Sequence, residues 1–91
     1  MTEYIIVLKE EKVKGYVDKD ELSGAVFHLE WGEDYIVYKT QNVIDEVNKS
    51  ELDKREKQSL IKKLSADENF EFKLSIELDE ILGDVDGEID F

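Results

Sequence analysis

The sequence predicts an α+β fold, in which two short helices cover a four- to five-stranded, mainly antiparallel sheet. Polar and apolar residues alternate in both halves of the chain, and a stretch with helical spacing of apolar residues separates them. A chain of 91 residues is long enough for one domain. We expect the order β-β-β-β-α-α-β, with a compact domain over residues 1–79 and an acidic C-terminal tail over residues 80–91.

The first half of the chain predicts four strands. Residues 4–8 are apolar on both faces, which is typical of a central strand covered on each side. Residues 12–17 alternate and can pair with the first strand as a hairpin. Residues 24–31 also alternate, with Phe27 and Trp31 on one face and His28 on the other. A turn at residues 32–34 then leads to a strand at residues 35–38, which predicts a second hairpin.

The middle of the chain predicts two short helices. Thr40 is expected to cap the first helix, in which Val43 and Val47 share a face. Ser50 and Asp53 resemble a capping box at the start of the second helix, which ends near residue 65. The buried stripe of the second helix is expected to consist of Leu52, Leu60, Ile61 and Leu64.

The clearest strand pattern lies at residues 69–78, where five apolar residues alternate with polar ones without a break. The tail at residues 84–91 alternates as well, with acidic residues at every second position. As a strand it would hold its carboxylates about 6.6–6.8 Å apart. This spacing is on the order of the 6–7 Å between successive phosphates of a DNA strand, which also wind around the axis. The tail can therefore imitate a row of phosphates.

The net charge of −12 is distributed unevenly along the chain. Residues 54–63 contain five basic residues and one acidic residue, whereas residues 77–90 contain seven acidic residues and no basic one. An acidic balance of this size argues against direct binding to nucleic acid or to an anionic membrane. The basic helix is expected to be a solvated outer face; the alternative is that it docks the acidic tail or an anionic group of a partner.

Several classes of site and location are excluded or disfavoured. The chain has no cysteine, and its first residues carry neither the positive charge nor the apolar length of a signal peptide. We expect a cytoplasmic protein in a bacterial host cell. Asp84 and Asp86-Gly87 resemble part of a calcium loop, but the ligands at both ends of that loop are missing. With one histidine, His28, and no catalytic set, the sequence predicts no enzyme, no metal and no cofactor.

These features favour a small acidic inhibitor or binding protein that mimics DNA and occupies the basic nucleic-acid-binding surface of a host protein. In general character the chain resembles the DNA-mimic proteins of phages and mobile elements, which implies nucleases, CRISPR effectors, restriction enzymes, nucleoid proteins or polymerases as targets. The expected partner-binding residues are acidic or aromatic and lie near the second hairpin and in the C-terminal part. They are Glu30, Trp31, Glu33, Asp34, Asp79, Glu80, Asp84, Asp86, Glu88, Asp90 and Phe91.

Other interpretations stay open. Residues 88–91 resemble the C-terminal tip of bacterial single-stranded-DNA-binding proteins, without that family's penultimate proline; the resemblance implies insertion of Phe91 into basic pockets of repair and replication enzymes. An immunity protein or antitoxin that neutralises a basic nuclease would have the same composition. A structural accessory module whose acidity maintains solubility is a third class. The oligomeric state is expected to be a monomer or a homodimer.

Overall fold

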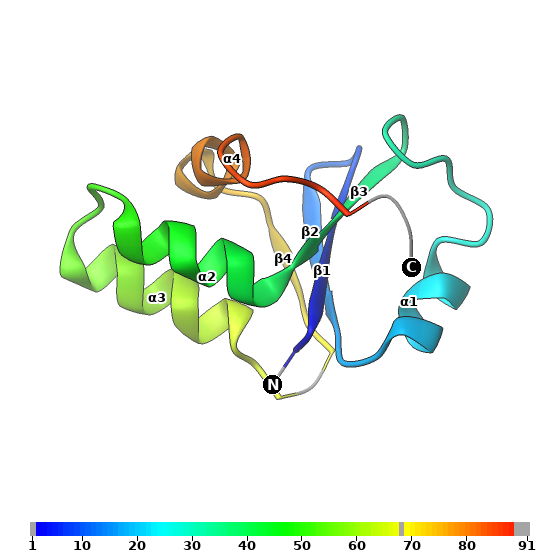
Figure 1. Ribbon diagram of the computed structural model, residues 1–91, viewed down its shortest axis with the longest axis horizontal. Coiled ribbons are helices and arrows are strands. Elements are labelled where there is room, and N and C mark those ends of the chain that lie inside the picture. Colours follow the sequence, from blue (N-terminus) through cyan, green and yellow to red (C-terminus); the bar gives the residue numbers. More distant parts are fainter. Residues whose placement is uncertain (1, 68, 89–91) are drawn as a thin grey trace.

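The computed structural model describes residues 2–67 and 69–88 and confirms the α+β class. The elements in chain order are β1 (Tyr4–Leu8), β2 (Lys12–Tyr16), α1 (Lys19–Ala25), β3 (Tyr35–Lys39), α2 (Thr40–Lys49), α3 (Lys54–Leu64), β4 (Glu71–Lys73) and α4 (Ile76–Leu82). Figure 1 shows the sheet in the middle, with α2, α3 and α4 on one side and α1 on the other.

The four strands form one antiparallel sheet in the order β3-β1-β2-β4. Ile5 and Ile6 of β1 point to opposite faces and are 0% and 1% exposed, which confirms the central strand covered on both sides. The hairpin of β1 and β2 is also confirmed. Its three-residue loop ends at Glu11, whose φ of 62° and hydrogen bond to the Leu8 carbonyl (2.9 Å) are typical of this loop length.

Two separate groups of buried side chains hold the layers together. The larger group lies between the sheet and α2, α3 and α4. It consists of Ile5, Val13, Tyr38, Val43, Ile44, Val47, Leu60, Leu64, Leu78, Ile81 and Leu82. The smaller group lies under α1 and consists of Ile6, Leu22, Val26, Tyr35 and Val37. The sheet is therefore the middle layer, and most of the core lies on the side of the three C-terminal helices.

The two helices expected in the middle of the chain are present as α2 and α3, inserted before the last strand as predicted. Their caps differ from the prediction. Lys39 is the N-cap of α2 and makes no side-chain capping bond, so Thr40 is the first helical residue. Asp53 caps α3 by accepting a hydrogen bond from the Glu56 N–H (2.9 Å), and Ser50 instead donates to the Val47 carbonyl. Leu60 and Leu64 are buried as expected.

The prediction of a strand at residues 24–31 is wrong, and with it the second hairpin. The helix α1 occupies residues 19–25 because Asp18 caps it through the Glu21 N–H (2.7 Å) and Leu22 and Val26, four residues apart, enter the core together. Turns follow, and Phe27 is 78% exposed rather than inward-facing. The strand expected at residues 35–38 does exist as β3, but it pairs with β1.

The long strand predicted at residues 69–78 is also wrong beyond Lys73. Ser75 accepts a hydrogen bond from the Leu78 N–H (3.1 Å) and starts α4, whose buried face is formed by Leu78, Ile81 and Leu82. A helical spacing that buries these three residues overrides the strand-like alternation before them. The predicted boundary between residues 79 and 80 falls inside this helix.

None of the helices in the described part of the chain is both long enough and apolar enough to cross a membrane.

Candidate acidic interaction surface

Acidic side chains gather where α2, the α2–α3 loop, α4 and the segment after α4 meet. Two adjoining hollows of about 230 and 360 Å³ lie there and share Asp84 as a lining residue. Seven carboxylates and one lysine, Lys49, line them. We call the seven the acidic surface: Asp45, Glu46, Glu51, Glu77, Glu80, Asp84 and Asp86.

The apolar faces of the two helices place these carboxylates. In α2, Val43, Ile44 and Val47 are buried, so the intervening Asp45 and Glu46 point away from the core. In α4, burial of Ile81 and its apolar neighbours turns Glu80 and Glu77 outward in the same way. The α2 and α4 parts of the acidic surface therefore follow directly from the amphipathic pattern of both helices.

Little within the chain neutralises the acidic surface. Between described residues its one ion pair joins Glu46 to Lys49 at 3.9 Å, and Asp45 accepts a hydrogen bond from the Gln41 amide (2.9 Å). The lysine side chain is 74% exposed, so this pair contributes little to stability. The arrangement of unpaired carboxylates can attract and hold cationic groups.

The segment after α4 does not form the predicted carboxylate ladder. Residues 83–85 form a turn, in which the Asp84 N–H bonds to the Ile81 carbonyl (3.0 Å). The chain then crosses to β3, as the red segment of Figure 1 shows, and makes an isolated β-bridge between Glu88 and Val37. Asp86 is exposed, and the last carboxylate of the expected ladder, Asp90, lies outside the described residues together with Phe91.

Trp31 fixes this crossing segment against β3. Its indole Nε1 donates to the Glu88 carbonyl at 2.6 Å, and the Glu88 N–H donates to the Val37 carbonyl at 2.6 Å. Gly87 makes room for the contact: a Cβ at this position would lie 2.7 Å from Cγ2 of Ile36. The Glu88 carboxylate also reaches Lys39 at 4.0 Å. Two parts of the predicted site, the Trp31 region and the tail, thus meet in space.

The other predicted site residues are more scattered. Glu30 and Asp34 belong to the loop before β3, where the Asp34 carboxylate accepts the Glu30 N–H (2.9 Å); Glu33 is exposed on the same loop. Asp79, exposed on α4, lies near Tyr38. Burial raises the pKa of the Tyr38 hydroxyl, and the charge of Asp79 raises it further. Of the predicted residues, Glu80, Asp84 and Asp86 belong to the acidic surface.

The basic helix does not hold the described part of the tail. The tail contacts β3 and Trp31 instead, and Lys57 of α3 donates to the Asn48 carbonyl (3.1 Å). Lys63 lies 5.4 Å from the ring centre of Phe72.

Sequence reasoning missed four members of the acidic surface, Asp45, Glu46, Glu51 and Glu77. The adjacent acids at positions 45 and 46, between apolar residues with helical spacing, were the available signal for the α2 part. The signal for Glu77 was the Ser75 cap, which places an acidic residue in a first helical turn.

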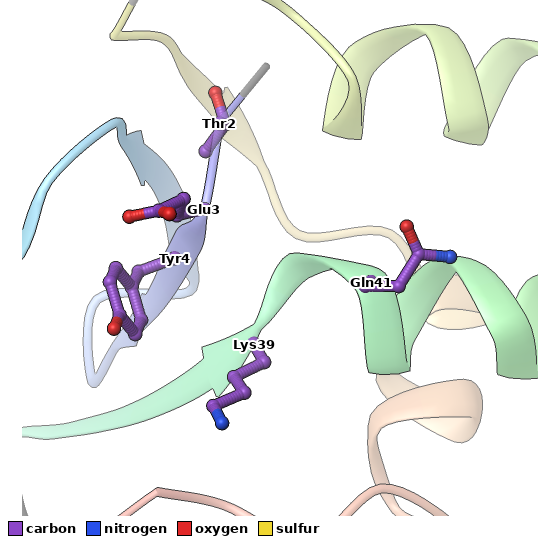
Figure 2. Close-up of a pocket in the computed structure, with 5 residues that line it drawn as sticks. All are labelled: Thr2, Glu3, Tyr4, Lys39 and Gln41. Atoms are coloured by element: carbon purple, nitrogen blue, oxygen red, sulfur yellow. The ribbon is translucent and has the colours of Figure 1, made fainter.

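A larger hollow of about 510 Å³ lies at the start of α2, where Glu3, Tyr4, Lys39, Gln41 and Thr2 line it. Figure 2 shows side chains from the start of β1 and from the junction of β3 and α2 around it. It combines one acid and one base, which gives no charge preference. In the described part of the chain, no group of three or more His, Cys, Asp or Glu is arranged to hold a metal ion.

No protein-family model matches the sequence, and searches of curated proteins and of solved structures give no match either.

Proposed function

We propose that the protein is a small, non-catalytic DNA mimic that binds the basic nucleic-acid-binding surface of a host protein. The acidic surface carries this proposal. Seven carboxylates line two adjoining hollows with one lysine between them, and Glu46 alone among them has an ion pair with a described residue. A basic surface that normally holds phosphates would relieve the mutual repulsion of these carboxylates and gain the charge pairs that the chain itself lacks.

The elements that hold the charges also support the proposal. Helices α2 and α4 hold four of the seven carboxylates, Asp45, Glu46, Glu77 and Glu80. The backbone that carries these charges is in place before a partner arrives, so little backbone ordering is needed on binding. Electrostatic attraction of this kind accelerates association and makes it sensitive to salt. The target is expected among nucleases, CRISPR effectors, restriction enzymes, nucleoid proteins and polymerases of a bacterium, with a phage or mobile element as the source.

An affinity-tagged full chain tests the proposal as bait in a bacterial lysate. We expect it to retain a DNA-binding protein or nuclease, to release it as salt increases, and to lose it when duplex DNA is added as a competitor. The retained protein is then purified, and its dissociation constant is measured with the full chain at several salt concentrations.

A charge-neutralised variant assigns the binding to the acidic surface. Glu80→Gln, Asp84→Asn and Asp86→Asn together remove three charges from it, and we expect binding to weaken at least tenfold. The matched control, Glu10→Gln, Asp20→Asn and Glu56→Gln, removes the same charge from exposed positions elsewhere and should bind within about twofold of the original chain. Equal weakening by both sets, or binding that is indifferent to salt and DNA, would contradict the proposal.

A further inference from the structure

The outer edge of β4 is open in the part of the chain that the structure describes. The strand pairs with β2 on one side, and no described strand lies on its other side. The opposite edge of the sheet is different: at β3, the Tyr35 carbonyl accepts the Gly32 N–H (2.7 Å) and the Val37 carbonyl accepts the Glu88 N–H (2.6 Å). One edge is thus covered by the chain itself and the other is not.

The ladder shows which backbone groups of β4 face outward. The Gly15 N–H donates to the Phe70 carbonyl, and the Leu74 N–H donates to the Glu11 carbonyl, both at 2.9 Å. Because residues of an antiparallel strand bond alternately to one side and the other, position 72 also bonds toward β2. The N–H and C=O groups of Glu71 and Lys73 therefore point outward, and no hydrogen bond to them from another described residue is present.

We propose that this edge is a homodimer interface, in which β4 of a second copy pairs antiparallel with β4 about a two-fold axis at Phe72. In this register Glu71 lies opposite Lys73 of the partner subunit, and Lys73 lies opposite Glu71 of the partner subunit. These are the positions whose backbone groups point outward, so each pair exchanges two hydrogen bonds. The two four-stranded sheets join into one continuous sheet.

The side chains favour the same register. Opposite charges face each other at both hydrogen-bonded pairs, and Phe72 faces its own copy at the intervening pair, where side chains approach most closely. Phe70 and Leu74, which are half-buried on the same face as Phe72, also come opposite each other. A shift by two residues in either direction would place Glu71 against Glu71 or Lys73 against Lys73, and like charges opposite each other are unfavourable.

The surroundings of the edge reduce the repulsion between two chains of charge −12. Lys12 and Lys14 of β2 lie 3.2 and 3.1 Å from the Glu71 carboxylate, and Lys73 is the cross-strand neighbour of Lys12. Three lysines and one glutamate thus surround this strand pair. The interface lies on β4, whereas the acidic surface lies on α2 and α4, so the dimer does not depend on the proposed function.

Sedimentation of the full chain over a concentration series tests the proposal, with Lys73→Glu as the main variant. This change puts Glu opposite Glu71 of the partner subunit but opposite Lys12 within the chain, so it breaks the dimer register without disturbing the fold. We expect the original chain to dimerise and the variant to have a dissociation constant at least tenfold larger. The control Lys54→Glu makes the same change in charge on α3 and should dimerise like the original chain.

Mixing two variants tests the register itself. In a pair of Lys73→Glu with Glu71→Lys, every cross-strand charge pair is again opposite, and we expect a heterodimer to form. Hydrogen exchange gives a readout that is independent of whether the second variant folds: the amides of positions 71 and 73 should become protected as the concentration of the original chain rises. A chain that stays monomeric up to about 1 mM, near the weakest useful affinity, would overturn the proposal. The proposal would also be overturned if Lys73→Glu dimerised as strongly as Lys54→Glu. The same holds if hydrogen exchange at positions 71 and 73 did not change with protein concentration.

Discussion

At the β3 edge of the sheet, carbonyl groups accept hydrogen bonds from a loop and from the C-terminal segment, whereas at the β4 edge the outward groups of Glu71 and Lys73 have no such cover among the described residues. The first edge is protected by backbone hydrogen bonds from the loop just before β3 and from Glu88, which is far away in sequence. The second carries alternating charge on a short strand, which is a common way to discourage random pairing. Such a charge pattern discourages arbitrary strands and still permits one strand with the complementary pattern, its own copy.

The largest effect is expected from Gly15→Ala, which should disturb the packing of β4 on β2. An added Cβ would overlap the ring of Phe70, the residue that leads into β4. We expect a loss of about 1–3 kcal/mol in the free energy of unfolding, as is usual for overpacking. Urea denaturation measures it. Gly24→Ala is the control because a Cβ there meets nothing within 4 Å, and this helical position should tolerate alanine. Equal stability of both variants would contradict the close packing of Phe70 on β2.

Gly87→Ala should displace the segment that covers the β3 edge, with a smaller loss in the free energy of unfolding. The new Cβ would lie 2.7 Å from Cγ2 of Ile36, which displaces the C-terminal segment. We expect a loss of about 1 kcal/mol, near the lower end for overpacking. Trp31 is the one tryptophan of the chain, so its fluorescence should shift to longer wavelength as the segment leaves it. Unchanged emission would show that this glycine is not needed for the contact.

Trp31→Phe tests the contribution of a single hydrogen bond to the cover of the β3 edge, because it removes that bond and keeps an aromatic ring. The Glu88 carbonyl loses its indole donor, but the bond is only partly buried, so water can replace the donor. We therefore expect a loss of about 0.5 kcal/mol in the free energy of unfolding. Urea denaturation followed by circular dichroism measures the change. In addition, hydrogen exchange at the Glu88 amide should accelerate. If that amide exchanges as slowly as in the original chain, the bond to Val37 alone holds the segment.

The smallest expected effect is a dependence on pH that is confined to the β4 edge. Hydrogen bonds from Lys14 and Lys12 lower the pKa of the Glu71 carboxyl below its usual 4.5. The same contact with Glu71 raises the pKa of Lys14 above 10.5. A lowered carboxyl pKa stabilises the fold above the unfolded value, and this contribution is lost as the pH falls through the folded value. Glu71 is solvent-exposed, so the effect is small.

Hydrogen exchange below pH 4.5 can detect this loss. The Gly15 amide, which bonds across β2 and β4, should open more often as the pH falls, relative to the Lys9 amide, which bonds across β1 and β3. Glu71→Gln should abolish the difference between the two amides. A difference that persists in this variant would assign the pH dependence to other carboxyl groups.

Local patterns were sufficient to predict the elements whose own residues supply the burial. Continuous apolar character marked β1 as central, and helical spacing marked α2 and α3. The pattern failed at residues 24–31, where alternation of a few residues fits a turn as well as a strand. The Asp18 cap and the spacing of Leu22 and Val26 were present in the sequence and favoured the helix α1. The Ser75 cap was the corresponding signal for α4.

The candidate site depended on tertiary packing to a greater extent than the fold. The acidic character of Glu80, Asp84 and Asp86 was evident from the sequence, but their grouping with Asp45 and Glu46 results from the packing of α4 beside α2. Likewise, the contact of Trp31 with position 88 joins residues 57 positions apart, and no local pattern encodes such a pair. The assignment of this surface to a partner stays a prediction.

The strand order also has a consequence for the way the protein is made. In the order β3-β1-β2-β4, the two middle strands are synthesised before the other two, and each later strand adds to an outer side. The hairpin of β1 and β2 forms through contacts that are short in sequence, so it can serve as a template on which β3 and then β4 assemble. Until β4 is synthesised, the β2 side of this nascent sheet lacks a neighbour, which makes that interval a stage at which the growing chain needs protection from aggregation.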